Sequence, residues 1–593
     1  MGVGGTAPRI PARPLAALLG VLLLTGACTQ PPGGADGPVV GPSPSATPPS
    51  SLRVAVVAPA DLDPRLLDSH EGLLVAAQLF DGLVSYDPET LAVVPAVAES
   101  WEMLDQGTRF RFRIRSGVTF HDGSAVTAES FVNAWNRLVD PVFSAPYAFL
   151  LESVKGFAQY QERLSVRGLS GLSAPDAQTL EVVLNRPWAD FPSLLAHPAL
   201  SPVPVTSGDD GFGAEPVGNG PYRMTAPLNP GAPVILQAYD GYYGVPALMP
   251  TLELHTVAGP DDAWPDFLSG ELEIAEIPAP LVRSAQSQFG SRGVVAEARQ
   301  LSCGFNEAQA RFADPALRTA VSLALDRASI AEGVYGGVPL PATGIVPPTL
   351  PGYAADVCAE NCAPDAERAE ALVAEVPKKD RAFALDYSAS TTGDQLAGEI
   401  AAQLGSIGLR VTPRPHDQLS FEAVLEGDQH EMFCLGAIAD YPRQQALLEP
   451  VLASGSPDNH ANVADPGIDA LLEEARARRD AGARQALYAD VEREALAAMH
   501  VIPVVWFRTK LAVQPYVRGF RIDPLGMFDA ATISVGFVSP QPPAPVVPDV
   551  PAPDLPGPEM PAPGAPAPGV PGGVPGGPPI PVPGQPPGAP PGG

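Results

Sequence analysis

The sequence predicts an α/β protein with more than one domain and a disordered, proline-rich end. Predicted strands and helices alternate between residues 52 and 538, which is the pattern of mixed α/β sheets. The length of 593 residues exceeds what one hydrophobic core usually spans, so two or more domains are expected. The chain also holds 73 prolines and 58 glycines, which is too many for compact structure throughout.

The first 28 residues resemble a bacterial export signal that ends in a lipidated cysteine. Arginines precede a ten-residue apolar run at 15–24, which is shorter than the roughly 20 residues of a membrane span. Small residues then precede Cys28, as in the lipobox of lipoproteins, although threonine stands at position 25 instead of the usual leucine. We therefore expect lipidation of Cys28 and anchoring to the outer face of the cell membrane. The alternative is a plain secretory signal with an unrelated cysteine.

Two further segments lack the apolar residues that a core requires. Residues 29–51 are rich in Pro, Gly and Ser and are predicted to form a flexible tether. Residues 540–593 combine Pro, Gly and Ala without a periodic apolar face, which predicts an extended, disordered tail. The tail is interpreted as passive, and a cell-wall spacer or a ligand of a proline-binding partner is the functional alternative.

The composition excludes several classes of protein. Lys and Arg number 36 against 66 Asp and Glu, giving a formal charge of −30, so no nucleic-acid partner is expected. This charge is typical of a protein that resists aggregation, and a monomer is expected. No P-loop, GxSxG or HExxH motif occurs, and the eight histidines show no local metal-ligand spacing. We therefore expect no enzyme activity, no cofactor and no metal.

Four cysteines remain once Cys28 is set aside for lipid. An even number of cysteines in an exported protein suggests two disulfides. Cys358 and Cys362 are close enough in sequence to close a local loop, and Cys303 with Cys434 would then join two strand-like segments. Buried free thiols remain the alternative for the second pair.

Apolar periodicity locates the first elements of the folded body. A β-branched run at 52–58 predicts a strand, and a helix is expected at about 71–80. Residues 108–115 alternate strictly, so their apolar side chains face a core while their arginines face water or form an anion site. Capping-type residues start a helix that is predicted over 127–138.

The later elements follow the same rules. Asp and Pro at 314–315 form a good helix start, and apolar residues recur on one helical face after them. A strand, a helix and a second strand are expected between 383 and 412. A long helical stretch at 467–499 is predicted to break near Asp480.

Short motifs follow one another in a specific order along residues 52–525. They lie at 79–84 (LFDGLV), 98–102 (AESWE), 110–115 (FRFRIR), 120–123 (FHDG), 218–222 (GNGPY), 269–275 (SGELEIA), 305–306 (FN), 312–318 (FADPALR), 324–327 (ALDR), 439–442 (ADYP) and 484–488 (RQALY). Each motif alone is weak, but the ordered set is specific. It resembles the family 5 extracellular solute-binding proteins, which serve peptide-importing ABC transporters.

This resemblance implies a two-lobed clamshell of the class II periplasmic-binding-protein type. The implied parts are a first lobe at 52–300, an extra subdomain within it at about 86–215, a second lobe at 306–505, and a return to the first lobe at 508–538. Crossovers near 303–306 and 503–507 would act as hinges. Closure about such hinges buries a solute between the lobes.

The resemblance also implies a receptor that delivers peptides to the permease subunits of an ABC transporter. By motif, Asp440 pairs with the α-ammonium group of the peptide, since an ammonium taken out of water needs a paired negative charge. A turn cap before Pro442 is the alternative role for Asp440. Tyr441 either lines the cleft or packs in a core, and Phe305 and Asn306 are further ligand-binding candidates.

Two departures from the family pattern bear on the ligand. Arg, Gln and Gln stand at 443–445, where the family often has acidic and proline residues. Residues 387–394 lack the arginine with which dipeptide binders hold the peptide's carboxylate. An oligopeptide or another solute is therefore expected rather than a strict dipeptide. The remaining alternatives are a cell-envelope scaffold that kept the fold and an exported hydrolase.

Overall fold

The computed structural model describes residues 50–162, 168–208, 211–355 and 357–536. The expected export signal with Cys28, the tether up to residue 49 and the tail at 540–593 lie outside the described residues. Their assignments therefore stay predictions, and so do the domain limits given above.

A six-stranded sheet combines segments from the beginning, the middle and the end of the body. Its strands, in spatial order, are β18 (Leu511–Val513), β11 (Ile274–Glu276), β1 (Ser51–Val57), β10 (Thr251–Val257), β9 (Val234–Ala238) and β8 (Tyr222–Met224). The central pair, β1 and β10, is parallel. The helices against this first sheet are α1 (His70–Leu79), α4 (Pro260–Ser269) and α5 (Val282–Phe289). The strand and helix predicted at 52–58 and 71–80 are confirmed.

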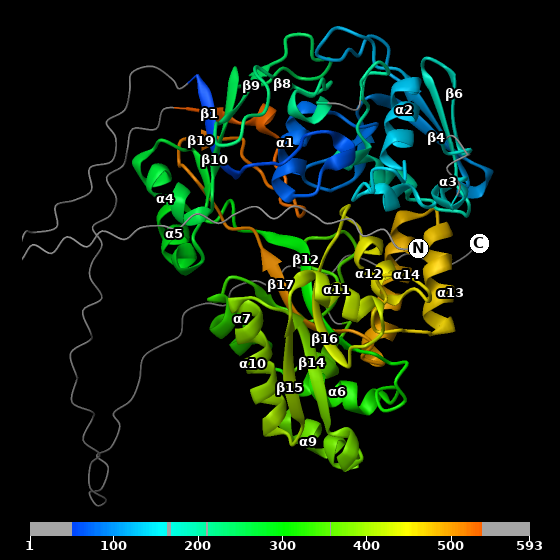
Figure 1. Cartoon of the computed structure of the whole chain (residues 1–593), viewed down its shortest axis with the longest axis vertical. Helices are drawn as coiled ribbons and strands as arrows, with labels where there is room; N and C mark the ends of the chain where they lie inside the picture. Colours follow the sequence, from blue (N-terminus) through cyan, green and yellow to red (C-terminus); the bar gives the residue numbers. More distant parts are fainter. Residues whose placement is uncertain (1–49, 163–167, 209–210, 356, 537–593) are drawn as a thin grey trace, which may run out of the picture. The chain divides into compact units, whose positions relative to one another are not determined.

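A second six-stranded sheet is built around the long strand β12 (Figure 1). Its strands, in spatial order, are β13 (Leu340–Pro341), β17 (Ile502–Arg508), β12 (Ala296–Phe305), β16 (Met432–Ile438), β14 (Ala382–Ser388) and β15 (Arg410–His416). The accompanying helices are α6 (Pro315–Ala324), α7 (Arg327–Tyr335), α8 (Ala359–Cys362), α9 (Ala366–Glu375), α10 (Thr391–Ser406), α11 (Gln418–Glu426), α12 (Gln445–Leu452), α13 (Pro466–Ala477) and α14 (Ala481–Ala497).

Side-chain caps set the helix starts that the sequence predicts. The Asp314 carboxylate accepts the Ala316 N–H at 2.9 Å, which begins α6. The Asp480 carboxylate likewise accepts the Ala483 N–H at 2.8 Å. This cap ends the continuity of the long helical stretch, so the predicted break between α13 and α14 is confirmed.

A four-stranded antiparallel sheet carries the alternating segment. Its strands, in spatial order, are β4 (Ala98–Leu104), β5 (Arg109–Ile114), β7 (Thr179–Val183) and β6 (Leu172–Asp176). The apolar side chains of β5 are almost fully buried, as predicted. Its arginines form ion pairs, including Arg111 with Glu181 at 2.8 Å and Arg109 with Asp105 at 2.8 Å. Because these carboxylates neutralise the arginines, the solvated-face interpretation is favoured over an anion site.

The smaller elements complete the described body. They are α2 (Ala128–Leu138), α3 (Phe157–Glu162), the hairpin of β2 (Val84–Tyr86) with β3 (Val93–Pro95), and the pair of β19 (Val517–Arg518) with β20 (Ser534–Val535).

The chain passes between the two large sheets at two neighbouring segments. It leaves the first sheet after β11 and enters the second at Ala296, and it returns between Arg508 and Leu511. The Leu511 N–H donates to the Gly293 carbonyl at 2.9 Å, so the two crossing segments are joined there. The hinges expected at 303–306 and 503–507 are therefore misplaced. Those residues are largely buried; 303–305 are the last three residues of β12, Asn306 directly follows them, and 503–507 lie inside β17.

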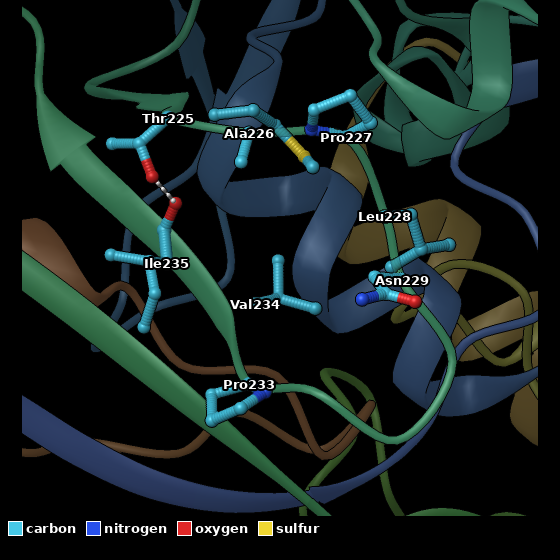
Figure 2. Close-up of a pocket in the computed structure, with 9 residues that line it drawn as sticks. Thr225, Ala226, Pro227, Leu228, Asn229, Pro233, Val234 and Ile235 are labelled. Carbon is cyan, nitrogen blue, oxygen red and sulfur yellow. Dashed lines mark hydrogen bonds between the residues drawn. The ribbon is translucent and has the colours of Figure 1, made fainter.

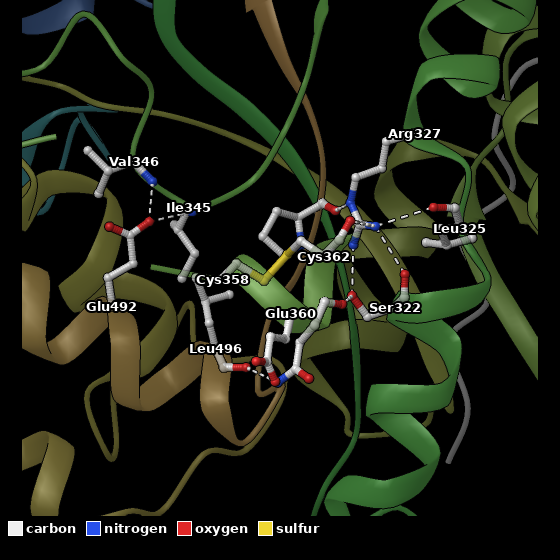
Figure 3. Close-up of a disulfide and its surroundings, with 12 residues drawn as sticks. Ser322, Leu325, Arg327, Ile345, Val346, Cys358, Glu360, Cys362, Glu492 and Leu496 are labelled. Carbon is white, nitrogen blue, oxygen red and sulfur yellow. Dashed lines mark hydrogen bonds between the residues drawn. A yellow bond between two sulfur atoms is a disulfide. The ribbon is translucent and has the colours of Figure 1, made fainter. Parts of the chain in front are cut away.

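Two disulfides tie the second sheet and its surroundings, and they join the cysteine pairs expected above. Cys303 and Cys434 stand directly opposite each other on β12 and β16. Cys358 and Cys362 close a short loop beside Arg327 (Figure 3). The Arg327 guanidinium donates to the Cys362 carbonyl at 2.9 Å and to the Pro503 carbonyl at 2.7 Å, which binds the loop to β17.

Candidate functional site

The carboxylate of Asp440 stands just beyond the end of β16, and no cation among the described residues pairs with it. Asp440 follows the strand by two residues and is half-buried. Burial, together with the charge of Asp458, raises the pKa of Asp440 to about 6. Among the described residues no ion pair to this carboxylate is found. The group is thus poised to receive a cationic partner from outside the chain.

The aromatic side chain of Tyr147, from another part of the chain, senses the charge of this carboxylate. Burial and the charge of Asp440 both raise the pKa of Tyr147, which places the phenol within electrostatic range of the acid. The Tyr147 ring centroid lies 4.4 Å from that of His197 and 6.2 Å from that of Phe149. Phe149 is 47% exposed, which is unusual for so large an apolar side chain. Tyr147 is thus the aromatic residue that senses the charge of Asp440, and His197 and Phe149 pack beside its ring.

The backbone of β16 next to Asp440 has a free edge. On one side, β16 pairs with β12 over its whole length. On the other side, β14 pairs only with Met432 and Phe433. From Leu435 to Ile438, no strand of the described residues pairs with that edge, and Ile438 is 50% exposed. Unpaired strand backbone is a template for the addition of another extended chain.

A small cavity lies beneath the same part of the second sheet. It measures about 40 Å³ and is lined by Gln300, Ser302 and Leu435 of β12 and β16, together with Asp458 and His460. This volume holds a water molecule or two rather than a substrate.

A second cavity of about 40 Å³ lies in the first sheet, where the chain turns from β8 to β9 (Figure 2). Among its lining residues, the Thr225 hydroxyl donates to the Ile235 carbonyl at 3.0 Å. Its lining contains no titratable side chain, so it offers no groups for chemistry or for charge recognition.

Tyr441 is buried against another aromatic residue. Its side chain is 7% exposed, and its ring centroid lies 6.2 Å from that of Trp188. Burial raises the pKa of the Tyr441 hydroxyl well above its ordinary value. Of the two roles left open above, packing agrees better with this burial than lining the cleft does.

Phe305 and Asn306 are not brought to the site. Phe305 is fully buried and pairs with Met432, at the opposite end of β16 from Asp440. At about 3.4 Å per residue, the two ends of β16 are about 20 Å apart, and Asp440 lies two residues beyond the far end. Asn306 is 1% exposed, and its amide donates to the Asp428 carbonyl at 3.1 Å. Their assignment as ligand-binding residues is therefore corrected, because their contacts are all internal to the protein.

Asp190 marks a contact that the sequence did not reveal. One of its oxygens accepts from Arg443 at 2.9 Å, and the other is 3.0 Å from Arg484. Beside it, the Trp188 indole donates to the Gln445 side chain at 2.9 Å. The only signal in the sequence was the departure at 443–445 from the family pattern, since Arg443 and Gln445 are two of the departing residues.

The paired crossings between two sheets and the unpaired acid at a free strand edge define a two-lobed α/β binding protein. Residues 92–459 match the family described as bacterial extracellular solute-binding proteins, family 5, middle region, and the chain belongs to this family. As a member of it, the protein acts outside the cytoplasm. Among the described residues, none of the helices combines the length and apolar character needed to cross a bilayer.

Similar proteins cover the folded body. The probable deoxycholate-binding periplasmic protein YgiS of Escherichia coli is 30% identical over 493 residues, which is 78% of this chain and 89% of YgiS. The periplasmic oligopeptide-binding protein OppA of Salmonella typhimurium is 27% identical over 494 residues, which is 78% of this chain and 88% of OppA. The crystal structure of Haemophilus influenzae OppA in complex with RPPGFSPFR covers 82% of this chain and 99% of that protein, with 23% identity and a TM-score of 0.65.

Proposed function

We propose that this protein is the substrate-binding component of an ABC importer and that it captures oligopeptides by their amino-terminal end. The single observation that carries the proposal is the half-buried Asp440 carboxylate, whose pKa burial raises to about 6 and which has no cation partner in the described residues. An α-ammonium group supplies the missing charge, and pairing removes the cost of keeping an ionised acid out of water. The OppA of Salmonella typhimurium is described as binding oligopeptides, and the OppA of Haemophilus influenzae was solved in complex with RPPGFSPFR.

The free edge of β16 supports the same mode of binding. An extended peptide laid along Leu435–Ile438 would exchange main-chain hydrogen bonds with the strand, and these bonds do not depend on its sequence. The strand ends two residues before Asp440, so a peptide bound there would reach the carboxylate with its terminus. Affinity without side-chain choice suits a receptor that imports mixed peptides.

The absence of a second charged anchor favours peptides longer than two residues. In the stretch 387–394, where dipeptide binders of the family carry an arginine, the Tyr387 hydroxyl instead donates to Asp394 at 2.9 Å. An acid at this place does not attract a carboxylate. A longer peptide can leave its carboxyl end in water, so it needs no such anchor.

Other parts of the proposal concern how the receptor works in the cell. Lipidation at Cys28 would hold the receptor beside the membrane permease. The receptor would act as a monomer, and closure of its lobes would carry the peptide to the permease. Binding and release involve no bond chemistry, which agrees with the names of YgiS and OppA, both described as binding proteins.

The test is mass spectrometry of small molecules released when the purified protein is denatured. Peptides of shared length are the expected result, and Asp440→Asn should lose them. Asp490→Asn is the matched control, because Asp490 is an exposed acid on α14 that pairs with Arg493. Release of a steroid acid instead, as the name of YgiS would suggest for that protein, would contradict the peptide assignment.

A further inference from the structure

Asp190 is shared between two arginines that lie far from it in the sequence. It precedes the short helical segment Phe191–Ala196, beyond the four-stranded sheet. Arg443 comes from the segment between β16 and α12, and Arg484 comes from α14. Their side chains are only 11–15% exposed, so the three charges are screened little by solvent. Each carboxylate oxygen faces a different arginine, at 2.9 and 3.0 Å.

The two residues before Asp190 also form hydrogen bonds to the part of the chain around α12, from which Arg443 and Arg484 come. The Ala189 N–H donates to the Arg476 carbonyl at 2.9 Å. The Trp188 indole donates to Gln445, and its ring stands against Tyr441. Residues 188–190 thus all bind the part of the chain that surrounds α12. This set of contacts is stronger than a single surface ion pair.

Arg443 makes a second contact with the first part of the chain. Its guanidinium donates to the Leu91 carbonyl at 3.0 Å, next to the β2–β3 hairpin. It also donates to the Pro442 carbonyl at 2.7 Å. The planar guanidinium therefore bridges residues 91 and 190 on one side and its own segment on the other, a geometry that a lysine cannot reproduce.

Only a short, stiff stretch separates Arg443 from Asp440. Pro442 restricts the backbone between them, and the Arg443 N–H donates to the Tyr441 carbonyl at 2.7 Å, closing a tight turn. A displacement of Arg443 is therefore passed on to the Asp440 carboxylate.

We propose that Asp190 is a positioning residue for the ligand anchor: through Arg443 and Arg484 it holds segment 440–445 against residues 188–190 and so fixes where the Asp440 carboxylate meets a ligand. Asp190 itself need not touch the ligand. The inference rests on the proposed role of Asp440 as the ammonium anchor. It also explains why positions 443 and 445 depart from the family pattern, since Arg443 and Gln445 serve this contact.

The first test measures how strongly binding depends on a free amino terminus. Affinities for tetra-alanine and for N-acetyl tetra-alanine are determined by calorimetry, and their ratio reports the ammonium–carboxylate contact. In Asp190→Asn and in Arg443→Gln, this ratio should fall about tenfold, and the double variant should lose no more than either single one. Arg443→Lys should restore little of it. An unchanged ratio, or two losses that add, would overturn the inference.

The control pair is Asp105→Asn and Arg109→Gln. These residues form an ion pair of similar length, 2.8 Å, but they are exposed and lie within a single sheet region. The ratio should stay within about twofold of the wild type in both controls. A fall in the controls equal to that in Asp190→Asn would show a general electrostatic effect and overturn the inference.

The second test does not depend on any ligand. Hydrogen exchange of the ligand-free protein should be slow at Ala189, whose N–H is bonded across the boundary, and Asp190→Asn should speed exchange there and in 441–446 while leaving β12 unchanged. Unchanged exchange would overturn the inference. If the wild type bound neither peptide while exchange responded as expected, the proposed function would fail and the contact itself would stand.

Discussion

Replacement of Asp440 by asparagine should weaken ligand binding and at the same time stabilise the ligand-free protein. In the folded protein the pKa of this acid is about 6, against 3.8 when it is unperturbed. This difference corresponds to a cost of about 3 kcal/mol for keeping the acid ionised at pH 7. The neutral amide avoids that cost, so the free energy of unfolding of the ligand-free Asp440→Asn variant at pH 7 should rise by as much as about 3 kcal/mol.

The sign of the pH dependence follows from the raised pKa. A carboxyl group that binds its proton more tightly in the folded state destabilises that state above its folded pKa, and the penalty is relieved as the pH falls from 7 towards 4. Ligand affinity moves the other way. At pH 5 a carboxyl group with a pKa of about 6 is ionised in about one molecule in ten, so affinity for an ammonium ligand should fall about tenfold relative to high pH.

Two titrations check this reasoning. Urea unfolding of the ligand-free wild type and of Asp440→Asn between pH 4 and 8 gives the stability difference, and calorimetry with a free-amino peptide gives the affinity. The variant should lack the share of each pH dependence that titrates with a pKa of about 6, while the contributions of other acids such as Glu492 remain. A wild-type affinity that stays constant from pH 7 to pH 5, or a variant less stable than the wild type at pH 7, would refute the assigned role.

Three further predictions concern the frame around the site. Peptide mapping without reductant should recover Cys303 linked to Cys434, and Cys303→Ser with Cys434→Ser should lower the free energy of unfolding by about 2–5 kcal/mol, since a long loop is released; mapping that finds free thiols would contradict the pairing. Phe305→Ala should cost about 3–5 kcal/mol of stability by leaving a cavity, while the ligand affinity of the remaining folded protein stays unchanged; a selective loss of affinity would restore Phe305 to the site. Burial raises the pKa of Glu492 to about 7, so the free energy of unfolding that Glu492→Gln gains over the wild type should be larger at pH 8 than at pH 6. A chemical-denaturation series that finds the larger gain at pH 6 would contradict this.

Local signals in the sequence predicted the elements well where the local rule and the fold agree. The alternation at 108–115 predicted β5, because every second side chain there enters the core. Asp314 and Asp480 predicted helix starts, because a carboxylate cap acts over two or three residues and needs no distant partner.

The hinges and two of the site residues could not be predicted in this way. The segments 303–306 and 503–507 were assigned from motif position alone, and their burial arises from strands that pair across more than 100 residues of sequence. The same pairing buries Phe305 at the end of β12, and Asn306 is buried directly after it. The Asp190–Arg443 contact joins residues 253 apart in sequence, and no periodicity or spacing rule reaches that far. Only the departure of residues 443–445 from the family pattern pointed to it.

The position of β18 and β17 in their sheets has a consequence for the order in which the chain can fold. β18 borders β11 of the first sheet, and β17 lies between β13 and β12 of the second, yet both come from residues 502–513. A chain that ends before residue 502 therefore leaves an open edge on the first sheet and splits β13 from the second. Neither half can be completed while the last tenth of the body is still being made or threaded out of the cytoplasm. Both sheets therefore reach their full set of strands only once residues 502–513 are available.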